Sequence, residues 1–407
     1  MNTHCQCSPT NKKLFTPGVF VLLSLMGIGL AFAIWRFLFG MGAVTNLSDS
    51  YPWGIWIAID VESGVALAAG GFTTAALVHI FHRKRYEPVV RLALMTAMLG
   101  YTFVATGLFV DLGRYYNIWH PMLPSLWQGN SVLFEVGMCV MAYLTVLYVE
   151  FTPVVTERLK GNINLPGSLA RYNQPLDRLV HFIDRTVGKV MFLFIIAGVV
   201  LSCMHQSALG TLLVIAPYKV HPLWYTPFLP MLFLMSAISV GFPMVIFASI
   251  LCDWTFNRKT DMKILASLGK IVPFFLIIYL TARLLDLLYR DALGYITEGS
   301  LQSTIFLIEV FGGFVLPLIL FLSKRVRNSL PGILTASLLV IIGVVFNRID
   351  TFLIAYKPVY LVDSYFPSIG EIAITVGLYS ALIFACRVVI TYLPVIPAAS
   401  EEPKGAL

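Results

Sequence analysis

Residues 53–80 read WGIWIAIDVESGVALAAGGFTTAALVHI, an apolar stretch long enough to cross a lipid bilayer as one helix. Two carboxylic acids, Asp60 and Glu62, interrupt this stretch. A charged side chain near the centre of a membrane helix costs about 2.5 to 3.5 kcal/mol on insertion scales, so such residues usually face a protein interior or an aqueous cavity. The two acids therefore predict a buried site for an ion, a proton or a substrate.

The composition of the whole chain indicates a membrane protein with several spans. Hydrophobic residues make up 58% of its 407 residues and charged residues 12%, far from the averages of soluble domains. Besides residues 53–80, other apolar stretches are long enough to cross a bilayer. They are residues 17–39, 90–111, 130–151, 187–210, 228–252, 268–289, 303–323, 332–352 and 371–392. We therefore predict an all-α, polytopic integral membrane protein with ten transmembrane helices.

The positions of the basic residues predict the orientation of these helices. If both termini are cytoplasmic, most of the 28 lysines and arginines lie at the inner ends and in the inner loops. This bias agrees with the positive-inside rule for membrane proteins. The net charge of +7 is then explained by topology, and we expect no nucleic-acid partner.

A weak internal repeat predicts how the helices are grouped. Asp111 and Glu135 are separated by nearly the same distance along the chain as Asp286 and Glu309. This suggests a duplication of four-helix bundles, made of helices two to five and six to nine, with helices one and ten at the flanks. The predicted parts are a cytoplasmic tail (1–16), the first helix and a periplasmic loop (17–52), the first bundle (53–210), the second bundle (211–356), and the last helix with a cytoplasmic tail (357–407). Within the first bundle, we expect residues 152–186 to form a cytoplasmic loop.

The polar residues of the first bundle concentrate at the outer ends of its helices. Carboxylates, imidazoles, a guanidinium and indole rings together suit a flat, apolar ligand with a carbonyl at each end, such as a quinone. Reduction to the quinol takes two electrons and two protons, so the site needs hydrogen-bond donors and a titratable group that delivers protons. We expect proton delivery from Asp60, Glu62, Glu135 and His205. The expected quinone-binding residues are Trp53, Trp56, Asp111, Arg114, His205 and His221.

Each candidate also has a simpler interpretation. Trp53 and Trp56 fit the aromatic belt at a membrane interface, Arg114 can form a surface ion pair with Asp111, and His205 can be a structural histidine. The deeper acids can be held by structural hydrogen bonds. A proton path is a further hypothesis, and its candidate residues are Arg283, Asp286, Glu309, Thr102 and Thr106. Mutual ion pairing explains the charged ones equally well, and threonines often bond back to their own helix.

The histidines argue against a haem. The chain has seven, of which His79 and His205 clearly belong to helix ends, at opposite faces of the membrane. Two stacked haems held between imidazoles on facing helices need four histidines paired by depth. We therefore expect no haem and no internal redox centre. We also expect no metal site and no iron–sulfur cluster in this chain.

Several motifs, taken in order, resemble the polysulfide-reductase membrane subunit (NrfD) family, and most closely its ten-helix branch. That branch includes the membrane subunits of hydrogenase 2 and of the menaquinone reductase complex of sulfate reducers. The motifs are Tyr51-Pro52-Trp53-Gly54-Ile55-Trp56-Ile57-Ala58-Ile59-Asp60, Asp111-Leu112-Gly113-Arg114-Tyr115, Asn130-Ser131-Val132-Leu133-Phe134-Glu135, Met204-His205-Gln206-Ser207, Tyr218-Lys219-Val220-His221-Pro222-Leu223-Trp224 and Tyr289-Arg290-Asp291.

The resemblance implies a cofactor-free subunit of the bacterial inner membrane that binds menaquinone near the periplasmic face, in its first bundle. Electrons would come from a periplasmic four-cluster iron–sulfur subunit. That subunit would be fed by a molybdopterin-type subunit and a multihaem cytochrome c, or by hydrogenase subunits.

We expect a quinone-reactive subunit of a multi-subunit oxidoreductase of the menaquinone reductase type. Proton uptake from the cytoplasm would make its turnover electrogenic. The alternatives are the quinone-coupled subunit of a periplasmic hydrogenase, a secondary proton or ion transporter, and an anchor that only tethers periplasmic enzymes.

Overall fold

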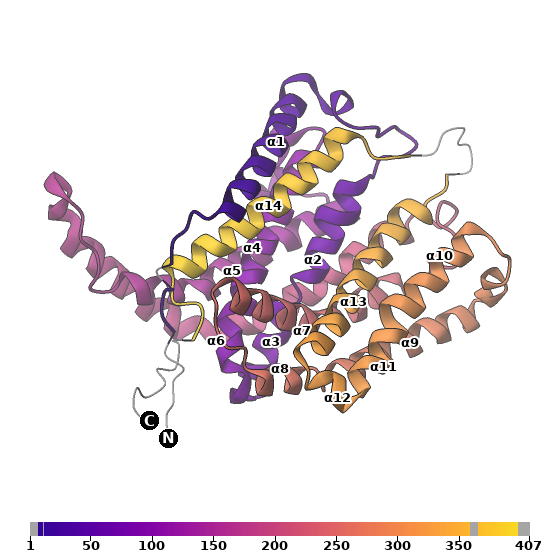
Figure 1. Cartoon of the computed structure of the whole chain (residues 1–407). Helices are drawn as coiled ribbons and strands as arrows, with labels where there is room; N and C mark the ends of the chain where they lie inside the picture. Colours follow the sequence, from indigo (N-terminus) through magenta and orange to yellow (C-terminus); the bar gives the residue numbers. More distant parts are fainter. Residues whose placement is uncertain (1–6, 11, 359–364, 398–407) are drawn as a thin grey trace.

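The computed structural model describes residues 7–10, 12–358 and 365–397, so the outer parts of both predicted tails lie outside the described residues. It contains ten helices long and apolar enough to cross a membrane, and the described residues form no β-strand. The predicted all-α, polytopic fold is confirmed (Figure 1). We call the side on which α1 begins and α14 ends the inner side, and the opposite side the outer side.

Most spans are single helices, but helix two and the last two spans of the second half are built from successive segments. Two short helices, α8 and α12, connect spans on the inner side. The bounds are α1 Pro17–Phe39; η2 Trp56–Ser63, α2 Gly64–Leu67, α3 Gly70–Ala75 and η3 Ala76–Ile80; α4 Glu87–Asp111; α5 Val132–Leu159; α6 Asn173–Val214; α7 Leu229–Thr255; α8 Met262–Leu268; α9 Val272–Tyr289; α10 Leu301–Val310, η10 Phe311–Val315 and α11 Leu316–Leu322; α12 Lys324–Arg327; α13 Leu330–Ile349 and η11 Asp350–Ile354; and α14 Ile369–Tyr392.

The prediction of a long inner loop over residues 152–186 is wrong. The helix α5 continues to Leu159 and α6 already begins at Asn173, so most of this stretch is helical. The two extensions bind each other, because the Thr156 hydroxyl donates to the Asp184 carboxylate at 2.8 Å and Lys160 forms an ion pair with the same group. The polar residues of this stretch lie on the exposed faces of two paired helices. Hydropathy alone cannot distinguish such polar helices from a loop.

The outer part of helix two is wound more widely than an α-helix. Segment η2 is π-helical, and the Ser63 hydroxyl donates to the Ala58 carbonyl, five residues back, at 2.7 Å. Wide turns of this kind are rare in proteins overall, and those that occur frequently lie at functional sites. Here the segment carries both intramembrane acids, with Asp60 directed to α14 and Glu62 to α13.

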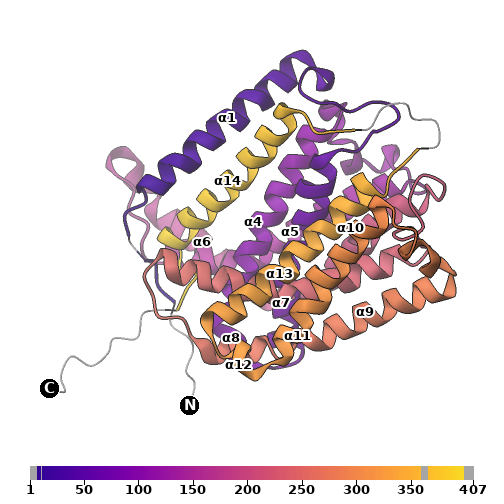
Figure 2. The same cartoon turned by 45° about the vertical axis from the view of Figure 1, so that its right-hand side comes forward.

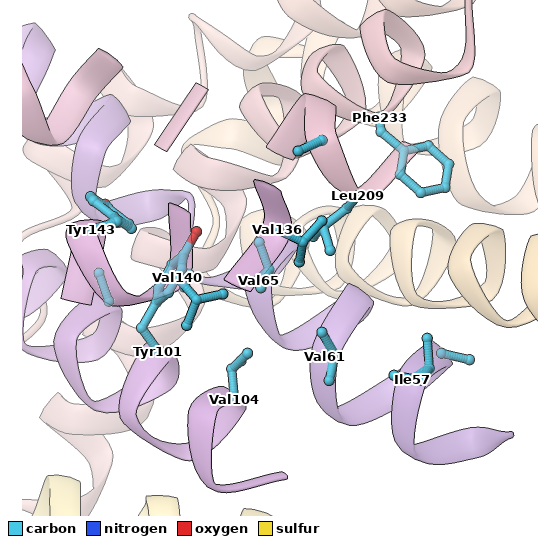
Figure 3. Close-up of a cluster of buried hydrophobic side chains, with 14 of the residues drawn as sticks. Ile57, Val61, Val65, Tyr101, Val104, Val136, Val140, Tyr143, Leu209 and Phe233 are labelled. Carbon is cyan, nitrogen blue, oxygen red and sulfur yellow. The ribbon is translucent and has the colours of Figure 1, made fainter. Parts of the chain in front are cut away.

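A stripe of apolar residues on helix two packs into the centre of the first half of the molecule. Ile57, Val61 and Val65 recur every four residues, so they lie on one face. They meet side chains from α4, α5 and α6, including Tyr101, Val140 and Leu209 (Figure 3). This packing fixes helix two and therefore the position of its acids.

The first and last spans form a pair on one side of the molecule. In both views α1 lies alongside α14, away from α9, α10 and α11 (Figures 1 and 2). The two helices touch where Gly29 faces Gly377, and a Cβ on Gly29 would lie 2.8 Å from the Gly377 Cα. Small residues allow such close contact between membrane helices. The predicted division into two four-helix bundles stays a prediction. The two halves are in direct contact, because α3 of the first half packs on α7 of the second.

This contact gives a first testable prediction, for Gly29→Val. The added side chain meets the α14 backbone, which cannot move aside as a flexible side chain can, and overpacking of this kind costs about 1 to 3 kcal/mol. Gly27→Val is the matched control, because nothing lies within 4 Å of a Cβ at Gly27. We expect a lower midpoint of thermal unfolding in detergent for Gly29→Val alone. Equal midpoints for both variants would contradict the packing of α1 on α14.

Candidate functional site

An apolar cavity of about 620 Å³ lies between α1, helix two, α4, α7 and α14. It follows α14 from Leu378 to Ile390, which at the rise of an α-helix is about 18 Å. Thr16, Thr255 and Arg387 lie at its inner end, and nearly all the remaining wall is hydrocarbon. The volume falls within the range of cavities that hold one organic ligand.

The buried acid Asp60 lies at the outer end of this cavity. The Thr375 hydroxyl donates to Asp60 Oδ2 at 2.8 Å, while Oδ1 meets no hydrogen-bond partner among the described residues. Tyr379 lines the cavity beside it and donates its hydroxyl to the Ile59 carbonyl at 3.2 Å. A buried polar atom without a partner is costly. Asp60 therefore marks the outer end of a long apolar space with a buried carboxyl group.

Asp60 is connected to the outer side by two more charged residues. Asp111, at the end of α4, lies close enough to Asp60 to interact with it electrostatically. Asp111 interacts electrostatically with Arg36 of α1, which is 1% exposed and donates to the Leu112 carbonyl. The predicted partner Arg114 is exposed. The ion pairs of the described residues do not include the expected surface pair of Arg114 and Asp111.

The indole rings of helix two take different directions. Trp56 is 1% exposed and donates its Nε1–H to the Glu371 carbonyl of α14 at 3.1 Å, one helical turn outside the contact of Asp60 with Thr375. Trp53 packs against Phe352 with the ring centroids 5.9 Å apart. Trp53 precedes the helical part of this span, because η2 begins at Trp56, and it faces η11 instead of α14.

Glu62 lies on the opposite side of helix two from the cavity. Its side chain is fully buried, and the nearest cation is Arg348 of α13, with 4.0 Å between Glu62 Oε2 and Arg348 Nε. No described residue hydrogen-bonds either oxygen of Glu62. Asp60 and Glu62 therefore belong to two separate sites.

His205 belongs to a third group, inside α4, α5 and α6. Its Nδ1 lies 3.2 Å from the Tyr101 hydroxyl, and the rings of Tyr101 and Tyr143 meet edge to face at 4.6 Å. Ser202 lies beside both tyrosines, and Glu150 lies near Tyr143 toward the inner side. This column of buried polar side chains runs along the first half of the molecule, but the structure does not connect it to Asp60.

Other predicted site residues lie apart from these groups. Glu135 is exposed in the first turn of α5, although it was expected to be buried. His221 precedes α7, where its Nδ1 accepts from the Leu223 backbone at 3.3 Å and its ring packs on Trp224 and Tyr295. Burial lowers the pKa of the His221 imidazole, which keeps it neutral at pH 7. These contacts are those of a structural residue.

The charged residues predicted for the proton path form two hydrogen-bonded groups in the second half, one around Glu309 and one around Asp286. Glu309 accepts from Trp224 at 2.9 Å, from Arg283 at 2.5 Å and from Asn347 at 2.9 Å. Asp286 lies nearer the outer side, where Arg290 and Thr226 donate to it. The hydroxyls of Thr102 and Thr106 bond back to carbonyls of their own helix, and Thr106 is exposed. The structure therefore brings the charged residues together and leaves the threonines outside.

Sequence reasoning missed several residues of these sites. Arg36 had a signal, because it is an arginine within an apolar span, and such residues seldom face lipid. No sequence signal pointed to Thr375 and Ser202, since hydroxyl side chains are common in membrane helices. Burial and the Glu371 carboxylate raise the pKa of the Tyr365 hydroxyl, and Tyr365 donates to Glu371 at 2.5 Å. That contact fixes the outer end of α14, which the sequence did not indicate.

Comparison with known proteins gives one family match that covers most of the chain. A sequence model of the family described as polysulphide reductase, NrfD, matches residues 43–357. The matched region contains helix two and α4 to α13, and with them Asp60, Glu62 and His205, whereas Arg36 and Thr375 lie outside it.

Three relatives are similar along nearly their whole length. A protein of Nitratidesulfovibrio vulgaris is 38% identical over 96% of this chain and 97% of its own. The probable Ni/Fe-hydrogenase 2 b-type cytochrome subunit of Escherichia coli is 33% identical over 97% of this chain and 96% of its own. The integral membrane subunit of the menaquinone reductase of N. vulgaris is 27% identical over 97% of this chain and 94% of its own.

Proposed function

The chain belongs to the polysulphide reductase NrfD family, and from this we propose that it is the quinone-reactive membrane subunit of a respiratory oxidoreductase. In this proposal it binds menaquinone, with the ring near the periplasmic face of the bacterial inner membrane. The name of the N. vulgaris menaquinone reductase subunit supports the choice of quinone. Both termini would lie in the cytoplasm, as the basic inner loops suggest.

The observation that carries the proposal is the unpartnered oxygen of Asp60 at the outer end of the 620 Å³ apolar cavity. A quinone has polar oxygens on its ring and a long hydrocarbon tail. Protonated Asp60 would donate the missing hydrogen bond from Oδ1 to a quinone ring oxygen, and the tail would occupy the apolar length along α14. A phospholipid chain would place hydrocarbon against the same buried oxygen and leave it unsatisfied. Polarity at the end of the cavity therefore favours the quinone.

Within this site the residues have distinct roles. Asp60 would hold or release the proton at the ring oxygen, because a positioned carboxyl group can act as a general acid or base. Thr375 would orient that carboxyl through the bond to Oδ2. Asp111, between Asp60 and the outer side, would exchange protons with Asp60. A bound quinone supplies the two-electron, two-proton acceptor, and these residues position it and control protonation.

The source of the protons is a separate hypothesis. The short route through Asp111 supports uptake from the periplasm, whereas uptake from the cytoplasm would use the column from Glu150 to His205, which is not connected to Asp60. Liposomes that contain the reconstituted complex distinguish the two, because cytoplasmic uptake generates a membrane potential during turnover. Turnover without any potential would remove the cytoplasmic path.

The electron donor would be a periplasmic four-cluster iron–sulfur subunit that docks at the outer side. It would be fed by a molybdopterin-type subunit and a multihaem cytochrome c, or by hydrogenase subunits. The hydrogenase alternative has specific support, because the hydrogenase 2 relative is more similar, at 33% identity, than the menaquinone reductase subunit, at 27%. A secondary transporter has no comparable support from the relatives.

We propose no haem in this chain, although the E. coli relative is named a b-type cytochrome subunit. A haem held by two histidines needs imidazoles that face each other at one depth. His79 lies in the last turn of η3 on the inner side, and His205 lies in the outer half of α6 with its Nδ1 near Tyr101. These two residues do not fit such a pair.

Filling the cavity tests the binding site. Ala248 lines the cavity on α7, and Ala248→Phe would place a ring in the space of the tail. We expect the quinone that copurifies with the complex to fall about tenfold, equivalent to about 1.4 kcal/mol. Ala31→Phe is the control, because Ala31 is exposed on α1 and does not line the cavity. An unchanged quinone content in Ala248→Phe would exclude the cavity as the binding site.

A further inference from the structure

Five charged residues meet where helix two touches the second half of the molecule. They form what we call the central charge cluster, namely Glu62, Arg283, Glu309, Arg348 and Asp350. Each is between 0% and 6% exposed. They come from helix two, α9, α10, α13 and η11, so the cluster connects elements far apart in the sequence.

Hydrogen bonds and an ion pair connect most of the cluster. Arg283 donates to Glu309 at 2.5 Å, and Asn347 donates to the same carboxylate at 2.9 Å. Arg348 donates to the Asn347 amide oxygen at 2.6 Å and lies 4.0 Å from Glu62. Asn347 and Arg348 therefore form a chain of contacts between Glu309 and Glu62.

The remaining member, Asp350, lies within hydrogen-bonding reach of Glu309. Its Oδ2 atom has no partner in the part of the chain that the structure describes. Two ionised carboxylates repel each other and have no proton to share, so a bond between them requires one proton. A hydrogen bond between Asp350 and Glu309 would therefore join a protonated carboxyl group to a carboxylate.

The balance of charge leads to the same conclusion. Among the described residues, the cluster has three carboxyl groups and two guanidinium groups. The other polar groups around it, which are Tyr279, Trp224, Ser236 and the paired Asp286 and Arg290, add no net charge. An uncompensated buried charge costs several kcal/mol. The cluster is neutral only when one carboxyl group is protonated.

We propose that the central charge cluster is a binding site for a single exchangeable proton, held between Asp350 and Glu309. The site is distinct from the quinone site, because Glu62 and Asp60 lie on opposite sides of helix two. A small cavity of about 10 Å³ lies between Arg283, Asn347 and Asp286, near the minimum size for one water molecule.

Infrared spectroscopy of the full-length protein tests this proposal without any need for quinone. A protonated carboxyl group absorbs at a frequency distinct from that of a carboxylate, and the band shifts in heavy water. When the spectrum of the variant is compared with that of the wild-type protein, we expect Asp350→Asn to have lost one band of a protonated carboxyl group. Glu62→Gln should lose it too, because two carboxylates then balance two guanidiniums. Arg348→Met should gain a band, since one cation must then be balanced by one carboxylate.

Asp286→Asn is the matched control. Its carboxylate is already paired with Arg290, with 2.7 Å between Arg290 Nη2 and Asp286 Oδ2, so this variant should keep the cluster's band. Gel filtration establishes that each variant is folded. Retention of the band in folded Asp350→Asn or Glu62→Gln would overturn the proposal. If the chain did not bind quinone, the same spectra would still be expected. The proton site and the proposed function are therefore tested separately.

Discussion

Asp60→Asn is expected to lower the rate of quinone reduction by the intact complex at least about 100-fold. General acid–base catalysis by a positioned group contributes about 10² to 10⁴ in rate, and an amide of the same shape cannot exchange the proton. The Asn side chain can still accept a hydrogen bond from Thr375, which now binds Oδ2 at 2.8 Å. We therefore expect the Asp60→Asn complex to assemble normally and to contain as much bound quinone as the wild-type complex. The measurement is steady-state reduction of a soluble menaquinone analogue.

Asp291→Asn is the control for this variant. Asp291 is exposed and has a φ of 52°, a conformation that Asn tolerates well. The same chemical change outside the site should leave the rate as in wild type. A wild-type rate in Asp60→Asn would remove this acid from the mechanism.

The second large effect is expected for Arg283→Met, on stability. The Arg283 side chain is 7% exposed and its partner Glu309 is fully buried, with 2.5 Å between the charged atoms. Removal of one partner of a buried pair costs about 3 to 5 kcal/mol, because the other charge stays buried without compensation. We expect a large loss in the free energy of unfolding, measured by denaturation of the purified chain in detergent.

Glu157→Gln provides the comparison for an exposed ion pair. Glu157 binds Arg91 at 2.7 Å, and the two side chains are 45% and 32% exposed. Exposed pairs of this type contribute about 0 to 1 kcal/mol. If Arg283→Met destabilised the protein no more than Glu157→Gln, the central charge cluster would not have the buried electrostatics described above.

Local patterns of apolarity were sufficient to predict the spans. The first helix was expected at residues 17–39 and is found at Pro17–Phe39, because hydropathy depends only on neighbouring residues. The inner extension of α6 to Asn173 was missed. Its polar residues contact α5 or solvent instead of lipid, and no local rule separates such a helix from a loop.

The site was predictable only in part, for two physical reasons. The burial of Asp60 and Glu62 was foreseen from the cost of placing carboxylates in lipid. The partners of each acid were not foreseen, because they come from distant parts of the chain, such as Thr375, 315 residues away from Asp60. Glu135 and Glu309 occupy matching positions in the predicted repeat, yet the first is exposed and the second is buried. Repeated spacing does not fix which face of a helix meets its neighbours.

The most direct test of the central claim is an electron cryomicroscopy map of the complex purified with its native quinone. We predict ring density within hydrogen-bonding distance of Asp60 Oδ1, with tail density along α14 toward Arg387. Ring density elsewhere, for example beside His205 within α4, α5 and α6, together with a phospholipid chain in the cavity, would contradict the proposed site.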